Sequence, residues 1–473
     1  MNFTNRTSRS PVVRLVVLTA GLSLWTALCQ AQNESPVAPE SPVPERVSGT
    51  ATVLPASGHG VVPGIADDQT AALQSLLDRA ADSDVQHVFV PRGTYHFNGS
   101  LRVPDGVTLS GVSVSVMAHN GIRDHGLPRP EQTGTTFLIH GNAGDENADP
   151  FLTLGTNSTV RGICFYYPDQ NPETEPTPYP WCIAMRGKNP ALLDCELLNA
   201  YLGIDATQNE RHLIRNISGQ PLKTGIFVDA IYDIGRIENV HFNPWWSMKP
   251  KLFAWQQQNG VAFRFARSDW QYVFNTFCFG YHIGYEFVAT ESGECNGNFL
   301  GIGADDCYTA VVVRQCAPMG LLITNGEFVS FHGPEPTMVR VESTNRGSVR
   351  FVNSAFWGPC RRIAEIDGTP DGVVGFSDCT FTQWGYPTAA QPDLPPCAAI
   401  SAAGGSLLVR GCEFRQDRPQ IELSETLRKC VITDNLMTGP LRIDHPGTVT
   451  SPRWIIDDNA SDHPSLSQGE TSR

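Results

Sequence analysis

The chain has 473 residues and a formal net charge of −14, from 34 basic and 48 acidic residues. An acidic protein repels the phosphate backbone, so the composition argues against a nucleic acid partner. The length would suit two or three ordinary domains, but a structure that grows by stacking repeats can reach it as one domain.

Residues 1–31 have the pattern of a secretory signal peptide. An apolar run from Leu15 to Leu28 follows three arginines and no acid, and Ala31 offers a small residue for cleavage. The run is too short to span a membrane. The sequence therefore predicts a secreted or periplasmic protein with no membrane span, and residues 32–60, rich in Pro, Ser, Glu and Ala, are predicted to be a disordered linker.

Residues 64–112 predict a helix followed by strands. Asp67 or Asp68 is placed to cap the helix. The apolar residues that follow recur at helical spacing: Ala72, Leu73, Leu76, Leu77 and Ala80. A strand from His87 to Val90, a Pro-Arg-Gly turn and two more strands come next. An amphipathic helix ahead of stacked strands is suited to cover the open end of their core.

A six-residue phrase recurs nine times after this segment. Each phrase has an apolar residue, a variable residue, a turn-forming Gly, Asp or Asn, and, three positions later, usually a Phe. The turn-forming residues tolerate left-handed backbone, and they are Gly162, Asp194, Asn216, Asn239, Asn325, Asn353, Asp378, Gly411 and Asp434. Successive phrases lie 22 to 33 residues apart, except for one gap of 86 residues between Phe242 and Phe328. We expect this gap to hold three or four further, degraded units.

Periods of this size are typical of a solenoid. Short extended runs such as 349–356, with no helical periodicity between them, favour a right-handed parallel β-helix. The helix and the repeats together resemble the pectate lyase superfamily, in particular its rhamnogalacturonase and epimerase-like branch. The resemblance covers residues 61–458 and implies an all-β, single-stranded, right-handed parallel β-helix with an N-terminal capping α-helix; residues 459–473 are expected to be a disordered tail. Lyases, hydrolases, epimerases and phage tailspikes share this pattern, so it implies the fold and leaves the reaction open.

Cysteines recur at fixed points of the repeat. Cys195, Cys379 and Cys412 occupy the same slot, which is predicted to face inward and to hold buried thiols. Other cysteines lie in turns or loops, where an oxidising compartment would permit disulfides: Cys295, Cys307, Cys316, Cys360 and Cys397.

The coil at residues 227–246 is the densest in ionisable groups. The candidate catalytic residues lie there or one to two coils before it: Glu196, Asp229, Asp233, Arg236, Glu238 and His241. Two carboxyls at suitable separation hydrolyse glycosidic bonds, whereas a base with an arginine that neutralises a uronate would suit a lyase. The alternative is that Asp233, Arg236 and Glu238 form an ion-pair ladder on a solvated face.

Aromatic residues follow several of the repeat phrases and predict a sugar-binding strip. The candidate substrate-binding residues are Tyr167, Tyr201, Trp245 and Trp246. The alternative is that these rings pack beneath a loop or at a subunit contact. The Pro-rich insertion at residues 166–181 is predicted to form a rim above the groove.

A second candidate site is the phrase Gly303-Ala304-Asp305-Asp306-Cys307, which is similar to the Gly-Asp-Asp-Cys phrase of polygalacturonase-type hydrolases. His332-Gly333 gives part of that family's Gly-His-Gly phrase, but the acid of its Asn-Thr-Asp phrase and its Arg-Ile-Lys phrase are absent. Asp305 and Asp306 are therefore interpreted as turn residues. No metal site is assigned; no cofactor is expected to be required, although acidic oxygens would permit calcium.

These patterns predict an exported carbohydrate-active protein. It would cleave a polysaccharide as a glycoside hydrolase or polysaccharide lyase, in a groove along the β-helix. The alternative is a non-catalytic glycan-binding or tailspike-like surface protein.

Overall fold

The computed structural model describes residues 52–112, 122–127, 129–369, 371–388, 391–447 and 453–462. The chain divides into two compact units, Met1–Ala51 and Thr52–Arg473, and the described residues all belong to the second. The predicted signal peptide, most of the predicted linker and most of the predicted tail therefore lie outside the described residues.

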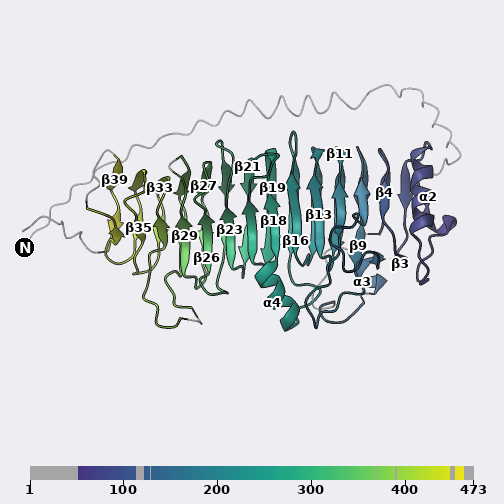
Figure 1. The fold of residues 1–473 in the computed structure, drawn as a ribbon, viewed down its shortest axis with the longest axis horizontal. Coiled ribbons are helices and arrows are strands. Elements are labelled where there is room, and N and C mark those ends of the chain that lie inside the picture. Colours follow the sequence, from purple (N-terminus) through teal and green to yellow (C-terminus); the bar gives the residue numbers. More distant parts are fainter. Residues whose placement is uncertain are drawn as a thin grey trace, which may run out of the picture. The chain divides into compact units, whose positions relative to one another are not determined.

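The unit is a stack of coils whose strands pair in parallel with those of the next coil (Figure 1). Sheet B takes one strand from each coil. Its strands are β4 (Leu101–Val103), β7 (Leu152–Leu154), β10 (Trp181–Met185), β13 (Leu202–Thr207), β16 (Thr224–Asp229), β18 (Val261–Phe265), β20 (Ile283–Phe287), β23 (Thr309–Val313), β26 (Thr337–Val341), β29 (Arg362–Ile366), β32 (Ile400–Ala402), β35 (Ile421–Leu423) and β38 (Ile443–Asp444).

Sheet A is larger and closes the other sides of each coil. Its strands are β1 (Leu54–Pro55), β2 (His87–Phe89), β3 (Gly93–Phe97), β5 (Thr108–Ser110), β6 (Thr135–Ile139), β8 (Thr159–Arg161), β9 (Ile163–Tyr166), β12 (Ala191–Leu197), β15 (Leu213–Gly219), β17 (Arg236–Phe242), β19 (Ser268–Phe279), β21 (Cys295–Leu300), β22 (Gly303–Asp305), β24 (Leu321–Thr324), β25 (Glu327–Phe328), β27 (Ser348–Val352), β28 (Ala355–Phe356), β30 (Val373–Ser377), β31 (Thr380–Phe381), β33 (Ser406–Arg410), β34 (Glu413–Phe414), β36 (Lys429–Thr433), β37 (Leu436–Met437), β39 (Trp454–Asp457) and β40 (Ala460–Ser461). The short strands β11 (Gly187–Lys188) and β14 (Asn209–Glu210) pair separately.

The repeat phrase forms a bend within sheet A. In β12, the residues before Asp194 pair with β8 and those after it pair with β9. All nine turn-forming residues have φ between 47° and 70°, as predicted. The bend divides sheet A into a leading face, made of the segments before the turn-forming residue, and a trailing face, made of those after it.

The long gap in the repeat holds two coils, not three or four. Their bends lie at Asn275 (φ 51°) and Gly301 (φ 64°). The prediction overcounted because the gap also contains helix α4 (Pro250–Asn259) and the long strand β19, which use residues without adding coils. A further bend at Asp458 (φ 54°) follows the ninth phrase.

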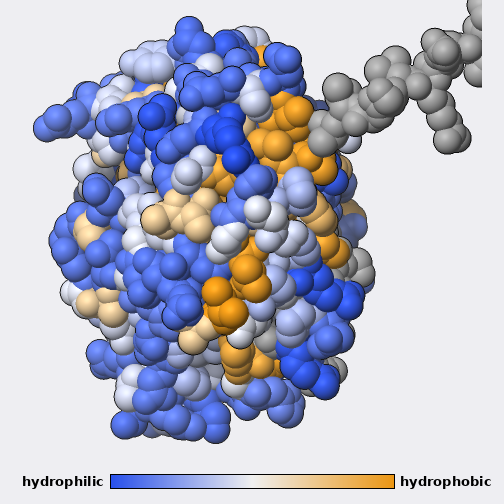
Figure 2. Space-filling model, turned by 90° about the vertical axis from the view of Figure 1, so that its right-hand side faces the viewer, coloured by the Kyte–Doolittle hydropathy of each residue, from blue (hydrophilic) through white to orange (hydrophobic). Residues whose placement is uncertain are grey.

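Helix α2 (Thr70–Ala81) covers the first coils, as predicted (Figure 1). Its apolar side chains Leu73, Leu76, Leu77 and Ala80 are buried in the core. Asp68 Oδ1 accepts hydrogen bonds from the Thr70 backbone N–H at 3.1 Å and hydroxyl at 2.6 Å. Seen from this end, the surface is mostly hydrophilic with smaller hydrophobic areas (Figure 2). The other described helices are the 3₁₀ turn η1 (Ala56–His59) and α3 (Pro130–Thr133).

The ordered unit extends beyond the predicted limits of 61–458. Strand β1 pairs with β2, and Ala56 is buried, so the end of the predicted linker belongs to the first coil. At the other end β40 pairs with β37.

The cysteines within the described residues are all free thiols, so the disulfides considered above are not formed. Cys195, Cys379 and Cys412 are buried, as their slot predicted. Cys295, Cys307, Cys316 and Cys360 are buried too, because Cys295 begins β21 and the loops that carry the other three fold against the core.

Candidate functional site

The residues predicted to be catalytic lie on separate faces of the β-helix. Asp229 ends β16, and its Oδ1 accepts hydrogen bonds from the backbone N–H of Ala230 at 2.7 Å and of Arg267 at 3.1 Å, and from the Thr290 hydroxyl at 2.9 Å. The bonds from Arg267 and Thr290 join neighbouring coils. As placed, this carboxylate holds the backbone together.

Arg236 and Glu238 lie on the leading face, and Asp233 lies in the turn before β17. Asp233 pairs with Arg211 at 2.7 Å, and Arg211 holds the pKa of Asp233 below its ordinary value. Glu238 lies 4.0 Å from Arg215. The ion-pair alternative therefore describes these two acids, whereas Arg236 is exposed and forms no ion pair with the described residues.

The trailing face carries Glu196 and His241. They stand in one register row, with Ser218 between them, so their backbones are about 10 Å apart. His241 lies between the rings of Trp245, at 4.8 Å, and Phe277, at 5.0 Å. Glu196 is buried, and burial raises its pKa to about 8. This pair alone, of the six predicted residues, shares a row.

The four aromatic residues predicted to bind sugar are all buried. Tyr167 packs edge-on against Tyr179 at 4.7 Å, and Tyr201 lies 5.9 Å from Trp255 of α4. Trp246 belongs to an apolar cluster with Leu252 of the same helix. The insertions cover these rings, which the repeat pattern could not show. An open strip of ring faces is therefore not formed by Tyr167, Tyr201, Trp245 and Trp246.

A hollow of about 260 Å³ opens further along the trailing face. It is lined by two carboxylates, Asp305 and Glu327, and by the rings of Phe277 and Trp357. The Trp357 indole N–H donates to Glu327 Oε1 at 2.8 Å, and its ring is 42% exposed. The hollow thus combines acids with an accessible aromatic face.

The two carboxylates lie on adjacent strands. Gly303 of β22 pairs with Glu327 of β25, so Asp305 is the diagonal neighbour of Glu327. The strand spacing and the rise of two residues place their backbones about 8 Å apart. Burial raises the pKa of Asp305, and the charges of Asp306 and Glu327 raise it further. A proton on Asp305 is therefore retained to higher pH than on an ordinary aspartate.

Asp306 turns away from this hollow, with φ 49°. Its carboxylate accepts a hydrogen bond from Gln257 of α4 at 3.0 Å and lies 3.2 Å from His332 Nδ1. His332 Nε2 is buried without a hydrogen-bond partner among the described residues. The structure therefore brings together Asp306 and His332. In the sequence these two residues belonged to separate phrases of the partial match to polygalacturonase-type hydrolases.

A further cluster of charges lies on sheet B. The buried Glu286 accepts hydrogen bonds from Arg264 Nε at 2.6 Å and from Arg314 Nε at 2.8 Å. His282 stacks on Tyr308 at 5.1 Å, and burial lowers the pKa of His282. The arginines remain partly exposed. Sequence patterns missed this cluster because its members come from different coils.

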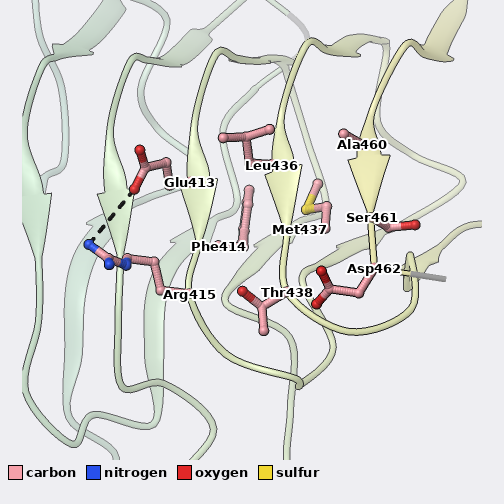
Figure 3. A pocket seen from close by; sticks show the side chains of 9 residues that line it. All are labelled: Glu413, Phe414, Arg415, Leu436, Met437, Thr438, Ala460, Ser461 and Asp462. Carbon is pink, nitrogen blue, oxygen red and sulfur yellow. Dashed lines mark ion pairs between the residues drawn. The ribbon is translucent and has the colours of Figure 1, made fainter. Parts of the chain in front are cut away.

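A second hollow of about 360 Å³ lies on the trailing face of the last coils (Figure 3). Its acids already have partners, since Glu413 lies 3.9 Å from Arg415 and Asp462 accepts a hydrogen bond from the Gly439 N–H at 2.8 Å. Its exposed apolar side chain is Leu436. The aromatic residue in its lining, Phe414, is buried, so this hollow offers no exposed ring face.

The described part of the chain contains no group of three or more His, Cys, Asp or Glu side chains placed to hold a metal ion. Calcium binding stays a prediction. Within the same residues, no helix has the length and apolar character needed to cross a membrane.

Comparison with known proteins gave no matching family model and no matching curated protein. Similar solved structures include bacteriophage phi29 gene product 12 (TM-score 0.51, 10% identity, 86% of this chain and 55% of that chain). Others are DFA-IIIase from Arthrobacter chlorophenolicus (0.42, 10%, 86% and 99%) and the A-module of the Azotobacter vinelandii mannuronan C-5 epimerase AlgE6 (0.39, 13%, 87% and 99%). At these identities the likeness concerns the fold alone, and it agrees with the parallel strand pairing, which shows a parallel β-helix.

Proposed function

We propose that the protein is an exported enzyme that hydrolyses glycosidic bonds of a polysaccharide in the hollow between Asp305 and Glu327. The supporting observation is the pair of carboxylates on adjacent strands, one with a raised pKa, beside the exposed ring of Trp357. An open hollow on a long face suits a polymer that continues past the site, since both ends of the chain can leave it.

The two acids would have different roles. Asp305, which keeps its proton longer, would protonate the leaving oxygen, and Glu327 would activate a water on the other face of the sugar. Inverting hydrolysis uses carboxyls roughly 6.5 to 9.5 Å apart, and the backbone separation of about 8 Å is compatible with this range. Trp357 would stack on a sugar ring while its N–H orients Glu327.

Two isosteric substitutions test this proposal. Asp305→Asn and Glu327→Gln should each reduce the release of reducing ends by about 10² to 10⁴-fold, because each removes one proton-transfer group. The matched control is Glu413→Gln, since Glu413 occupies the same outward row. Unchanged turnover in both variants would contradict the assignment. Loss of turnover in Glu238→Gln instead would favour the catalytic coil that the sequence predicted at residues 227–246.

Elimination is the second candidate, because His332 Nδ1 lies 3.2 Å from Asp306 and its Nε2 is buried without a hydrogen-bond partner among the described residues. The imidazole would take the proton beside a uronate carboxylate, and an arginine would neutralise that carboxylate. Absorbance near 235 nm on polyuronates, lost in His332→Gln, would establish this reaction. Glycan retention without either product would favour a binding protein.

A further inference from the structure

The leading face of sheet A carries an exposed row of aromatic rings that the hollow does not use. Trp270, Tyr272 and Phe274 alternate along β19, and their exposed fractions are 60%, 39% and 51%. Side chains two residues apart on a strand share a face, at a spacing of about 6.6 Å. We call these three residues the aromatic row.

Trp270 is held in an unusual backbone conformation. Its φ is 57°, at a register irregularity between Ser268 and Gln271, and its N–H donates to Asn296 Oδ1 at 2.7 Å. A bulky residue with positive φ has a strained backbone, and such residues concentrate at functional sites. Here the irregularity directs a large ring to solvent, so burial of the ring does not offset the backbone strain.

Polar side chains border the aromatic row on the β17 side, whereas Asn298 and the exposed Leu300 border it on the β21 side. Arg236 and Glu238 of β17 are in register with Tyr272 and Phe274, and Asn298 of β21 is in register with Tyr272. Glu238 lies 4.0 Å from Arg215, so its charge is partly compensated. Arg236 forms no ion pair within the described part of the chain and is therefore the cation available for an anionic ligand.

We propose that the aromatic row and Arg236 form a second binding surface, for a polysaccharide that carries carboxylates. Sugar rings present an apolar face to an aromatic ring and hydroxyls to the polar side chains around it. Arg236 forms a charge-assisted pair with a uronate carboxylate. The row and the hollow lie on either side of the bend at Asn275, so this surface holds the polymer near the hollow without taking part in cleavage.

Binding is measured on a full-length chain that carries Asp305→Asn and Glu327→Gln, with oligogalacturonate and alginate oligomers as acidic probes and cello-oligosaccharides as the neutral probe. Trp270→Ala and Tyr272→Ala should each weaken binding of the acidic probes at least tenfold. Arg236→Gln should weaken binding of the acidic probes and leave any binding of the neutral probe unchanged. Because cleavage is already disabled, failure of the hydrolysis proposal leaves this measurement intact.

Leu436→Ala is the control, since it removes an exposed apolar side chain from the other face and should not change binding. Phe274→Ala replaces Trp270→Ala if the latter lowers the thermal midpoint. Equal affinity in the aromatic variants, or absence of binding to both polyuronates, overturns the proposal. A change from dimer to monomer in Trp270→Ala, with glycan binding unaltered, overturns it in favour of a protein contact.

Discussion

At the scale of single residues, position in the fold determines what each acid can do. Glu196 and Glu327 occupy the same outward row of the trailing face, several coils apart. Glu327 is exposed beside Trp357, whereas Glu196 is buried next to Cys164, which belongs to an apolar cluster. Burial raises the pKa of Glu196 to about 8.

Glu196 should make stability depend on pH. Its carboxyl binds a proton more tightly in the folded state than in the unfolded state. The free energy of unfolding therefore falls as the pH rises from 4.5, its ordinary pKa, to about 8. Glu196→Gln should remove this slope and raise the free energy of unfolding at pH 7 by roughly 1 to 3 kcal/mol, since one pKa unit corresponds to about 1.4 kcal/mol. Denaturant unfolding at pH 5, 7 and 9 measures the pH dependence of the free energy of unfolding, with Glu413→Gln as the exposed control. If the free energy of unfolding of Glu196→Gln depended on pH as steeply as that of the wild type, burial of Glu196 would not be the cause of the slope.

At the scale of elements, the bend is held by a ladder of side chains. Asn216 donates to Asp194 at 2.7 Å, Asn239 to Asn216 at 2.9 Å, and Asn275 to Asn239 at 3.1 Å. Each residue has positive φ, which its short polar side chain tolerates. The ladder aligns successive bends and so keeps the leading and trailing faces of sheet A continuous.

The ladder can be tested at Asn239. Asn239→Ala should lower the free energy of unfolding by about 2 to 3 kcal/mol, because it loses two hydrogen bonds and places a Cβ without compensation at φ 52°. Asn239→Gly also loses the bonds but tolerates this φ, so its loss should be about 1 to 2 kcal/mol. Equal losses in the two variants, measured by denaturant unfolding, would show that backbone strain contributes nothing.

At the scale of the whole molecule, a stack of coils exposes its core at the ends. Helix α2 covers the first end with Leu73, Leu76, Leu77 and Ala80. Without such a cover, the first strands would present unpaired edges and apolar side chains to other molecules.

Leu77→Asp should therefore promote association. The buried charge would displace α2 from the core, and light scattering should show oligomers that the parent lacks. Ser75→Asp adds the same charge on the exposed side of the helix and should remain like the parent. A Leu77→Asp protein that stays monomeric and folded would argue against the capping role.

The sequence by itself determined the coil: turn residues in fixed slots specify the bends, apolar residues around them specify the core, and the fold follows. It could not determine which outward residues share a face, because a bend separates Glu238 from His241 although only two residues lie between them. Nor could it show that the insertions bury Trp245 and Trp246 while Trp270 and Trp357 stay exposed. Those outcomes depend on contacts between coils distant in sequence, so the tertiary structure alone decided where Asp305, Glu327 and the aromatic row lie.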